Sequence, residues 1–103
     1  MIITCVAIFQ YDDDDGICVF VPDLPVCNTC GYSHDEAVEM AKEVIELALH
    51  GMHIDELPIF RRKEEFIPSL NQTLVDISIN IENREGVLFS SKVINLDKNL
   101  GTV

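Results

Sequence analysis

The chain has 103 residues, of which 48% are hydrophobic, which is enough for one domain with a buried core. Its formal net charge is −11 at pH 7, and the whole excess precedes Arg61, since residues 1–60 hold twelve acidic residues and one basic residue. Such a field repels phosphate and attracts basic surfaces, so it argues against direct nucleic-acid binding and makes a basic protein partner plausible. On charge alone, however, a general solubility charge is the favoured interpretation. No apolar run is long enough to cross a membrane, and the N-terminus lacks the features of a signal peptide, so we expect a cytoplasmic protein with reduced thiols.

Three strands are predicted in the first third of the chain. Residues 2–10 are β-branched and apolar on both alternating faces, which is typical of a strand that is covered on both sides. A run of four Asp residues forms a turn in which Tyr11 is expected to pair with Gly16, and residues 17–21 form the second strand. Residues 26–32 are predicted to form a short third strand.

One amphipathic helix is predicted over residues 34–50. Ser33 and Glu36 have the spacing of a capping box, and Gly51 is suited to the position after the last turn. The apolar residues at helical spacing form the expected core face, namely Ala37, Met40, Ala41, Val44, Ile45, Ala48 and Met52. The opposite, solvated face is expected to hold Asp35, Glu39, Lys42, Glu43 and Glu46.

Two further strands are predicted after a connecting segment, residues 55–69, that holds the only basic cluster. Residues 73–81 alternate strictly between apolar and polar, and residues 87–96 are predicted to form a fifth strand, antiparallel to the fourth at the sheet edge. A right-handed helical crossover is expected to place the fourth strand parallel to the first. An exposed apolar edge strand invites pairing with a second chain, so we expect a homodimer through this region.

The segment GICVFVPDLPVCNTCGYSHDEAVEMAKEVIELAL resembles the HicB antitoxin family. Residues that match its motifs are Pro22, Asp23, Leu24, Pro25 and Cys27, then Thr29, Gly31, Ser33, Glu36, Ala37 and Ala41. One departure is Val26, where the family usually has Gly. The resemblance defines a HicB-like domain over residues 1–82 and a C-terminal extension over residues 83–103.

The resemblance implies an α+β fold, β-β-β-α-β-β, in which a partly degraded ribonuclease H-like sheet of order 3-2-1-4-5 carries one helix on one face. It also implies a non-enzymatic antitoxin without a cofactor, which masks a small basic RNA-cleaving toxin of the HicA type. Many members carry a C-terminal DNA-binding domain, but residues 83–103 fit only a turn and an edge strand. We therefore expect no complete DNA-binding domain in this chain.

The acidic residues give the candidate partner-binding site. Electrostatic complementarity would speed their association with a basic toxin. The alternative is that these side chains form an ordinary solvated surface without a partner. The candidate residues are Asp23, Asp35, Glu36, Glu39, Glu43 and Glu46. No catalytic or metal-binding residue is expected.

Two cysteines with C-x-x-C spacing, Cys27 and Cys30, allow an alternative reading as a zinc or thiol protein. Residues three apart on a strand point to opposite faces, so we expect Cys27 in the core and Cys30 at a variable position. Cys5 and Cys18, the other two thiols, are not expected to be cross-strand neighbours. A second alternative is a structural or RNA-associated module that has no toxin partner.

Overall fold

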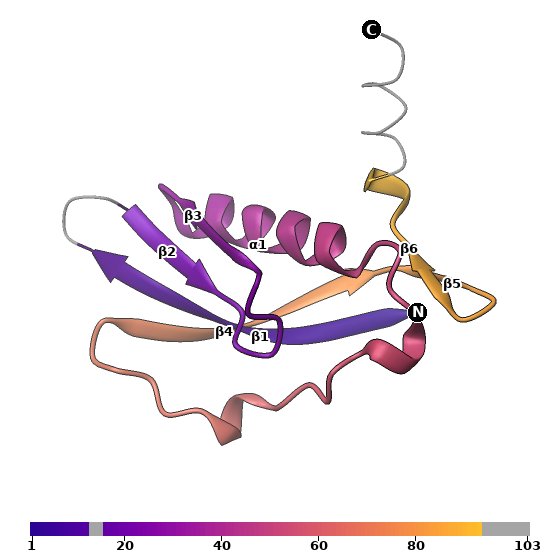
Figure 1. Ribbon diagram of the computed structural model, residues 1–103. Helices are drawn as coiled ribbons and strands as arrows, with labels where there is room; N and C mark the ends of the chain where they lie inside the picture. Colours follow the sequence, from indigo (N-terminus) through magenta and orange to yellow (C-terminus); the bar gives the residue numbers. More distant parts are fainter. Residues whose placement is uncertain (13–15, 94–103) are drawn as a thin grey trace, which may run out of the picture.

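A computed structural model describes residues 1–12 and 16–93, and Figure 1 shows a twisted sheet with one long helix across it. The sheet contains β1 (Ile2–Asp12), β2 (Gly16–Phe20), β3 (Asn28–Gly31) and β4 (Gln72–Asn80), in the order β3-β2-β1-β4. The helix α1 (His34–Leu49) packs on one face. The α+β class and the order of these four strands are confirmed.

The face of the sheet under α1 forms the core. Ala7 and Phe9 of β1 are fully buried there, together with Val19 of β2 and Ile77 of β4. The alternation predicted for β4 is confirmed, because Ile77, Ile79 and Ile81 are buried whereas Asp76, Ser78 and Asn80 are exposed.

The β1–β2 hairpin differs from the predicted register by one residue. Asp12, not Tyr11, pairs with Gly16, which has a positive φ of 84°. Phe9 therefore lies opposite Val19. This register places the apolar residues of both strands on the helix side, whereas a shift by one residue would turn one strand's apolar set to the other face.

The helix begins and ends as predicted. Ser33 Oγ accepts a hydrogen bond from the backbone N–H of Glu36 at 3.1 Å, and Glu36 Oε1 accepts one from the N–H of Tyr32 at 3.2 Å. Gly51 follows the helix with a φ of 84°, a conformation that glycine adopts without strain. The capping residues therefore predict both ends of α1 to within one residue.

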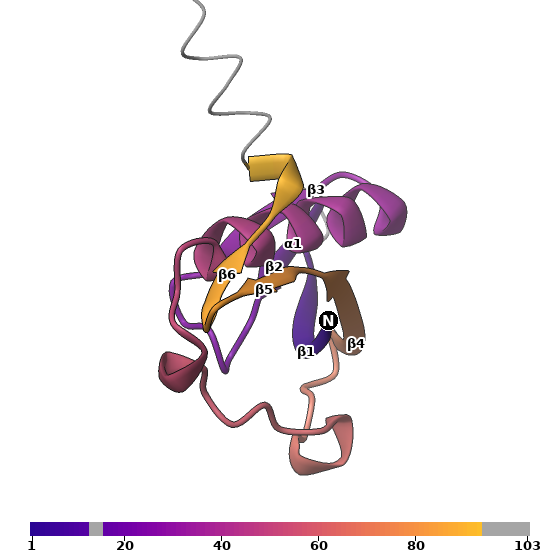
Figure 2. The same ribbon diagram turned by 90° about the vertical axis from the view of Figure 1, so that its right-hand side faces the viewer.

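The prediction that β4 is parallel to β1 is wrong, because the two strands are antiparallel, with Ile2 opposite Asn80 and Gln10 opposite Gln72. The physical reason is the path of residues 50–71. Figure 2 shows this segment passing along the side of the sheet that α1 leaves uncovered. It contains two short 3₁₀ helices, η1 (Ile54–Glu56) and η2 (Lys63–Glu65), and it returns the chain to the far end of the sheet before β4 begins.

The predicted fifth strand of the sheet is also wrong. β5 (Glu82–Arg84) and β6 (Val87–Phe89) form a separate two-stranded hairpin, in which Glu82 pairs with Phe89. β6 is instead hydrogen-bonded to the segment after α1. The backbone N–H of Leu88 donates to the backbone oxygen of Met52, and the N–H of Gly51 donates to the backbone oxygen of Leu88. Residues 91–93 are helical rather than extended, and residues 94–96 of the predicted strand lie outside the described residues.

The hairpin packs on the same core as the sheet, because Leu88 is fully buried within the main hydrophobic cluster. The division of the chain at residue 82 stays a prediction. Within residues 1–12 and 16–93, no helix has the length and apolar character needed to cross a membrane.

Candidate partner-binding surface

Four of the six candidate acidic residues lie together on the outer side of α1. Asp35, Glu36, Glu39 and Glu43 are all exposed. Within the described part of the chain, Lys42 is the basic side chain that forms an ion pair with this strip, with Nζ 3.7 Å from Glu39 Oε1. An exposed i,i+3 pair of this kind contributes little to stability, so most of the strip's negative charge is available to a partner.

Glu46 does not share this exposure, although it was predicted on the solvated face. It is 6% exposed, and its carboxylate accepts a hydrogen bond from Ser90 Oγ at 3.2 Å. Lys92 Nζ lies 3.7 Å from the same carboxylate. Glu46 therefore fastens the C-terminal segment to α1, a contact that the helical pattern alone does not reveal.

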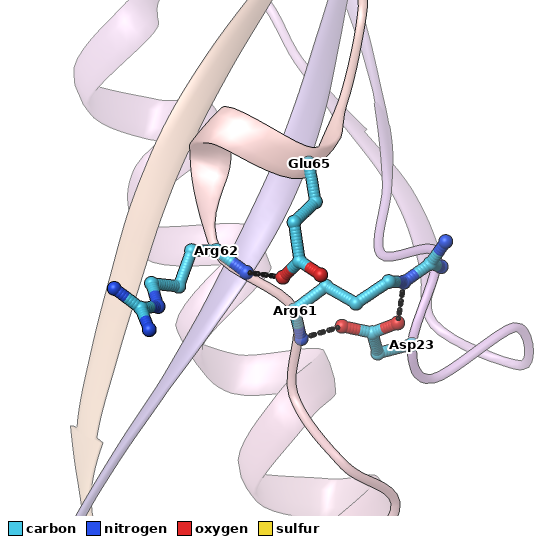
Figure 3. A network of polar contacts seen from close by, with 4 residues as sticks. All are labelled: Asp23, Arg61, Arg62 and Glu65. Carbon is cyan, nitrogen blue, oxygen red and sulfur yellow. Dashed lines mark hydrogen bonds and ion pairs between the residues drawn. The ribbon is translucent and has the colours of Figure 1, made fainter.

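Asp23 is also engaged within the chain, as Figure 3 shows. Its carboxylate accepts hydrogen bonds from the backbone N–H and from Nε of Arg61, both at 2.7 Å, and its side chain is 7% exposed. The Arg61 guanidinium in turn lies 4.5 Å from the centre of the Phe66 ring. The Asp of the PDLP motif thus anchors the connecting segment under the sheet.

The rest of the basic cluster is part of the same segment. The backbone N–H of Arg62 donates to Glu65 Oε2 at 2.7 Å and so caps η2 (Figure 3). Lys63 Nζ lies 3.7 Å from Asp76 of β4. These contacts hold residues 61–65 against the sheet on the side away from the acidic strip.

An apolar patch adjoins the acidic strip at the edge of the sheet. β3 is an edge strand, and a shallow pocket of about 170 Å³ lies between it and α1. Its lining is Thr29, Met40, Glu43, Val44 and Leu47. Leu47 is 62% exposed, and Val26 and Tyr32, at the two ends of β3, are 81% and 85% exposed.

Exposed apolar side chains that are rimmed by charge are typical of protein interfaces. Val26, Tyr32 and Leu47 were not among the predicted site residues. A signal was present, since Leu47 falls on the polar side of the helix and Val26 replaces the family's usual glycine. We call Asp35, Glu36, Glu39 and Glu43, together with Leu47 and the pocket beside it, the α1–β3 surface.

The C-x-x-C pair diverges as predicted. Cys27 is fully buried and its Sγ donates to the backbone oxygen of Val44 at 3.6 Å, whereas Cys30 is exposed. Burial raises the pKa of the Cys27 thiol, and burial together with the nearby Cys27 and Asp23 raises that of Cys5 to about 12. Both thiols are therefore poor nucleophiles and poor metal ligands.

Across the part of the chain that the structure describes, no three His, Cys, Asp or Glu side chains gather in a way that could hold a metal ion. The zinc alternative for Cys27 and Cys30 therefore gains no support from the fold.

A family model described as "HicB_like antitoxin of bacterial toxin-antitoxin system" matches residues 5–72. The chain belongs to this HicB-like antitoxin family. The matched range spans β1 to the start of β4, so it includes the PDLP motif and all of α1.

Two individual proteins are also similar. A "UPF0150 protein" of Helicobacter pylori strain J99 is 40% identical over 55 residues, which are 53% of this chain and 76% of that protein. A solved structure titled "Toxin-Antitoxin complex from Streptococcus pneumoniae" contains a chain that matches with a TM-score of 0.61 at 18% identity, covering 98% of this chain and 90% of that one. At this identity the structural match shows a shared fold.

Proposed function

We propose that this HicB-like protein is a non-catalytic antitoxin that neutralises a small, basic, RNA-cleaving toxin of the HicA type by masking it. Membership of an antitoxin family supports the role, and the fold it shares with a chain of a toxin–antitoxin complex is consistent with it. The feature of this chain that carries the proposal is the α1–β3 surface, where exposed carboxylates flank exposed apolar side chains.

The two parts of the α1–β3 surface have different tasks in this proposal. The carboxylates attract a basic toxin over a distance of about one Debye length, roughly 8–10 Å at physiological salt, and so raise the association rate. Leu47 and the apolar pocket that it lines with Met40 and Val44 supply apolar area that slows dissociation once the partner is bound. Asp23 and Glu46 contribute indirectly, because their carboxylates hold the connecting segment and the C-terminal segment in place.

The test uses the small basic protein encoded in the neighbouring reading frame, purified and assayed for RNA cleavage with and without this protein. We expect one-to-one inhibition. The double reversal Glu39→Lys/Glu43→Lys should slow association roughly tenfold at low salt and flatten its salt dependence. Surface plasmon resonance at several salt concentrations measures both quantities.

The matched control is Glu64→Lys/Glu85→Lys, which changes the net charge equally at exposed positions outside α1. We expect this control to keep most of the association rate. If both double variants slow association equally, the overall net charge of the protein determines the association rate, and the α1–β3 surface has no special role. If the neighbouring protein is bound by neither the wild type nor the variants, or if no such protein is encoded, the antitoxin role itself fails.

The same proposal includes a cytoplasmic location, where the toxin's RNA is found, and a homodimer. Because β6 leaves the main sheet, the free edge on that side is β4 and not the C-terminal strand. β4 carries one charged residue, Asp76, which is paired with Lys63, so two copies can approach there with less repulsion than at the β3 edge, beside which the carboxylates of α1 lie. Light scattering over a range of concentrations tests the dimer, and a monomer throughout would contradict it.

A further inference from the structure

β2 and β3 place two cysteines directly opposite each other, since Cys18 is the cross-strand partner of Cys30. The C-x-x-C spacing drew attention to Cys27 and Cys30, but the pairing that the fold creates is a different one. It depends on the register of two strands joined by the PDLP segment.

The backbone pattern fixes the kind of pair. Cys27 O accepts a hydrogen bond from Val21 N–H at 3.2 Å, in the same register that pairs Val19 with Thr29. Hydrogen-bonded and non-hydrogen-bonded pairs alternate along antiparallel strands, so Cys18 and Cys30 form a non-hydrogen-bonded pair. The Cα atoms of such pairs are about 4.5 Å apart, within the range of about 4.4–6.8 Å that disulfides require.

The environment of this pair also differs from that of the other two thiols. Cys30 is exposed and Cys18 is half-buried, on the sheet face away from α1, where Asp12 Oδ2 lies 3.8 Å from Cys18 Sγ. Cys5 and Cys27 are fully buried under α1. Solvent and small oxidants therefore reach Cys18 and Cys30, whereas Cys5 and Cys27 are shielded from them.

We propose that Cys18 and Cys30 are a modification site, a dithiol that a hydroperoxide converts into a reversible intramolecular disulfide. One thiol attacks the peroxide oxygen, which breaks the O–O bond and yields a sulfenic acid and water (or an alcohol). The second thiol attacks the sulfenic sulfur, forming the S–S bond and releasing water. The two thiols are oxidised, the peroxide is reduced, and a dithiol reductant reverses the change.

The bond would fasten the short edge strand β3 to β2. β3 contributes Thr29 to the pocket of the α1–β3 surface and lies between Val26 and Tyr32. The disulfide would therefore restrict movement at one side of that surface. The site itself is independent of the proposed toxin, so it can be tested on the isolated chain.

The first experiment treats the purified full-length protein with hydrogen peroxide and then blocks the remaining thiols with an alkylating reagent. Trypsin does not separate the four cysteines, because the chain has no Lys or Arg before Lys42. Cleavage before Asp23 separates Cys18 from Cys30, and fragmentation in the mass spectrometer at Asn28 or Thr29 distinguishes Cys30 from Cys27. We expect one Cys18–Cys30 link, a mass loss of two hydrogen atoms, and reversal by dithiothreitol.

A second experiment tests proximity without an oxidant. Phenylarsine oxide bridges two neighbouring thiols, and we expect it to bind the wild type with one arsenic per chain. Cys18→Ser and Cys30→Ser should each abolish this binding, whereas the control Cys5→Ala should retain it. Each single serine variant should also stop at a sulfenic acid or link two chains when it is oxidised.

Three outcomes would overturn the proposal. They are a link that involves Cys5 or Cys27, overoxidation of Cys30 without an S–S bond in the wild type, and arsenical binding that persists in both serine variants. Thermal unfolding gives an independent readout, since the midpoint should rise on oxidation of the wild type and not of Cys30→Ser. An unchanged midpoint in a protein shown to carry the bond would refute the fastening of β3 while leaving the modification site.

Discussion

Leu88→Ala tests whether the β5–β6 hairpin belongs to the same folding unit as the sheet. The Leu88 side chain is fully buried in the main core, and the backbone on either side of it is bonded to the segment after α1. Truncating a buried leucine removes transfer free energy and leaves a cavity, which together cost about 2–5 kcal/mol. A domain of this size has a total stability of about 5–15 kcal/mol, so the loss is a large share of it.

The assay is urea unfolding followed by circular dichroism, with the midpoint and the slope determined for each variant. The chain offers a matched control in Leu70→Ala, because Leu70 is fully exposed, and we expect this change to stay within about 0.5 kcal/mol. Leu88→Ala should lower the midpoint strongly with a single transition and an unchanged slope. If Leu88→Ala behaves like Leu70→Ala, the hairpin is an appendage and the division of the chain at residue 82 is the correct description.

Three further predictions concern stability. Gly31→Ala should cost about 1–3 kcal/mol in urea unfolding, because a Cβ there would lie 2.7 Å from the backbone N of Ala37, whereas Cys30→Ala beside it should be nearly neutral. Burial raises the pKa of Cys5 from 9.0 to about 12, so the thiol ionises first in the unfolded chain. The contribution of Cys5 to stability should therefore be constant below pH 9 and fall above it by up to about 1.4 kcal/mol per pH unit, and the loss of stability above pH 9 should be less steep in Cys5→Ala. Asp23→Asn should speed amide hydrogen exchange at Arg61 and its neighbours with little change in the global midpoint, and equal exchange in both proteins would contradict the anchoring role.

The elements with strong local signals could be predicted from the sequence. α1 has a capping box at one end, a glycine at the other and helical spacing between them, and the structure reproduces all three. β4 has strict alternation, and its apolar residues do face the core. In both elements the local preference and the tertiary packing agree, which is the condition under which pattern-based prediction works.

The wrong predictions concern elements whose placement depends on contacts between residues that are distant in the sequence. The direction of β4 depends on the path of residues 50–71, which contain little regular structure and are held by contacts such as Arg61 to Asp23 that have no local signal. The position of the C-terminal hairpin also depends on distant residues, because Leu88 is fully buried where its backbone is hydrogen-bonded to Gly51 and Met52. Glu46 was misplaced for the same reason, since Ser90 and Lys92 are distant from it in the sequence.

The candidate surface could be predicted only in part. The acidic side chains of α1 follow from helical spacing, and those at Asp35, Glu36, Glu39 and Glu43 are exposed as expected. The pocket beside them could not be found, because the position of Thr29 next to Met40 and Leu47 of α1 depends on where the edge strand β3 packs. The pairing of Cys18 with Cys30 likewise depends on strand register, and spacing along the chain does not reveal it.

The distribution of charge acquires a structural explanation from the ion pairs. The basic side chains after residue 60 mostly contact acidic groups of the same chain, in the pairs Arg61–Asp23, Lys63–Asp76, Arg84–Glu82 and Lys92–Glu46. Two of these pairs neutralise acids of the first half that would otherwise add to its field. Among residues 1–12 and 16–93, the one ion pair that involves the exposed acids of α1 is that between Lys42 and Glu39. Internal pairing thus leaves the exposed carboxylates of α1 largely uncompensated, so that they can steer a basic partner to the side of the helix where Leu47 is also exposed.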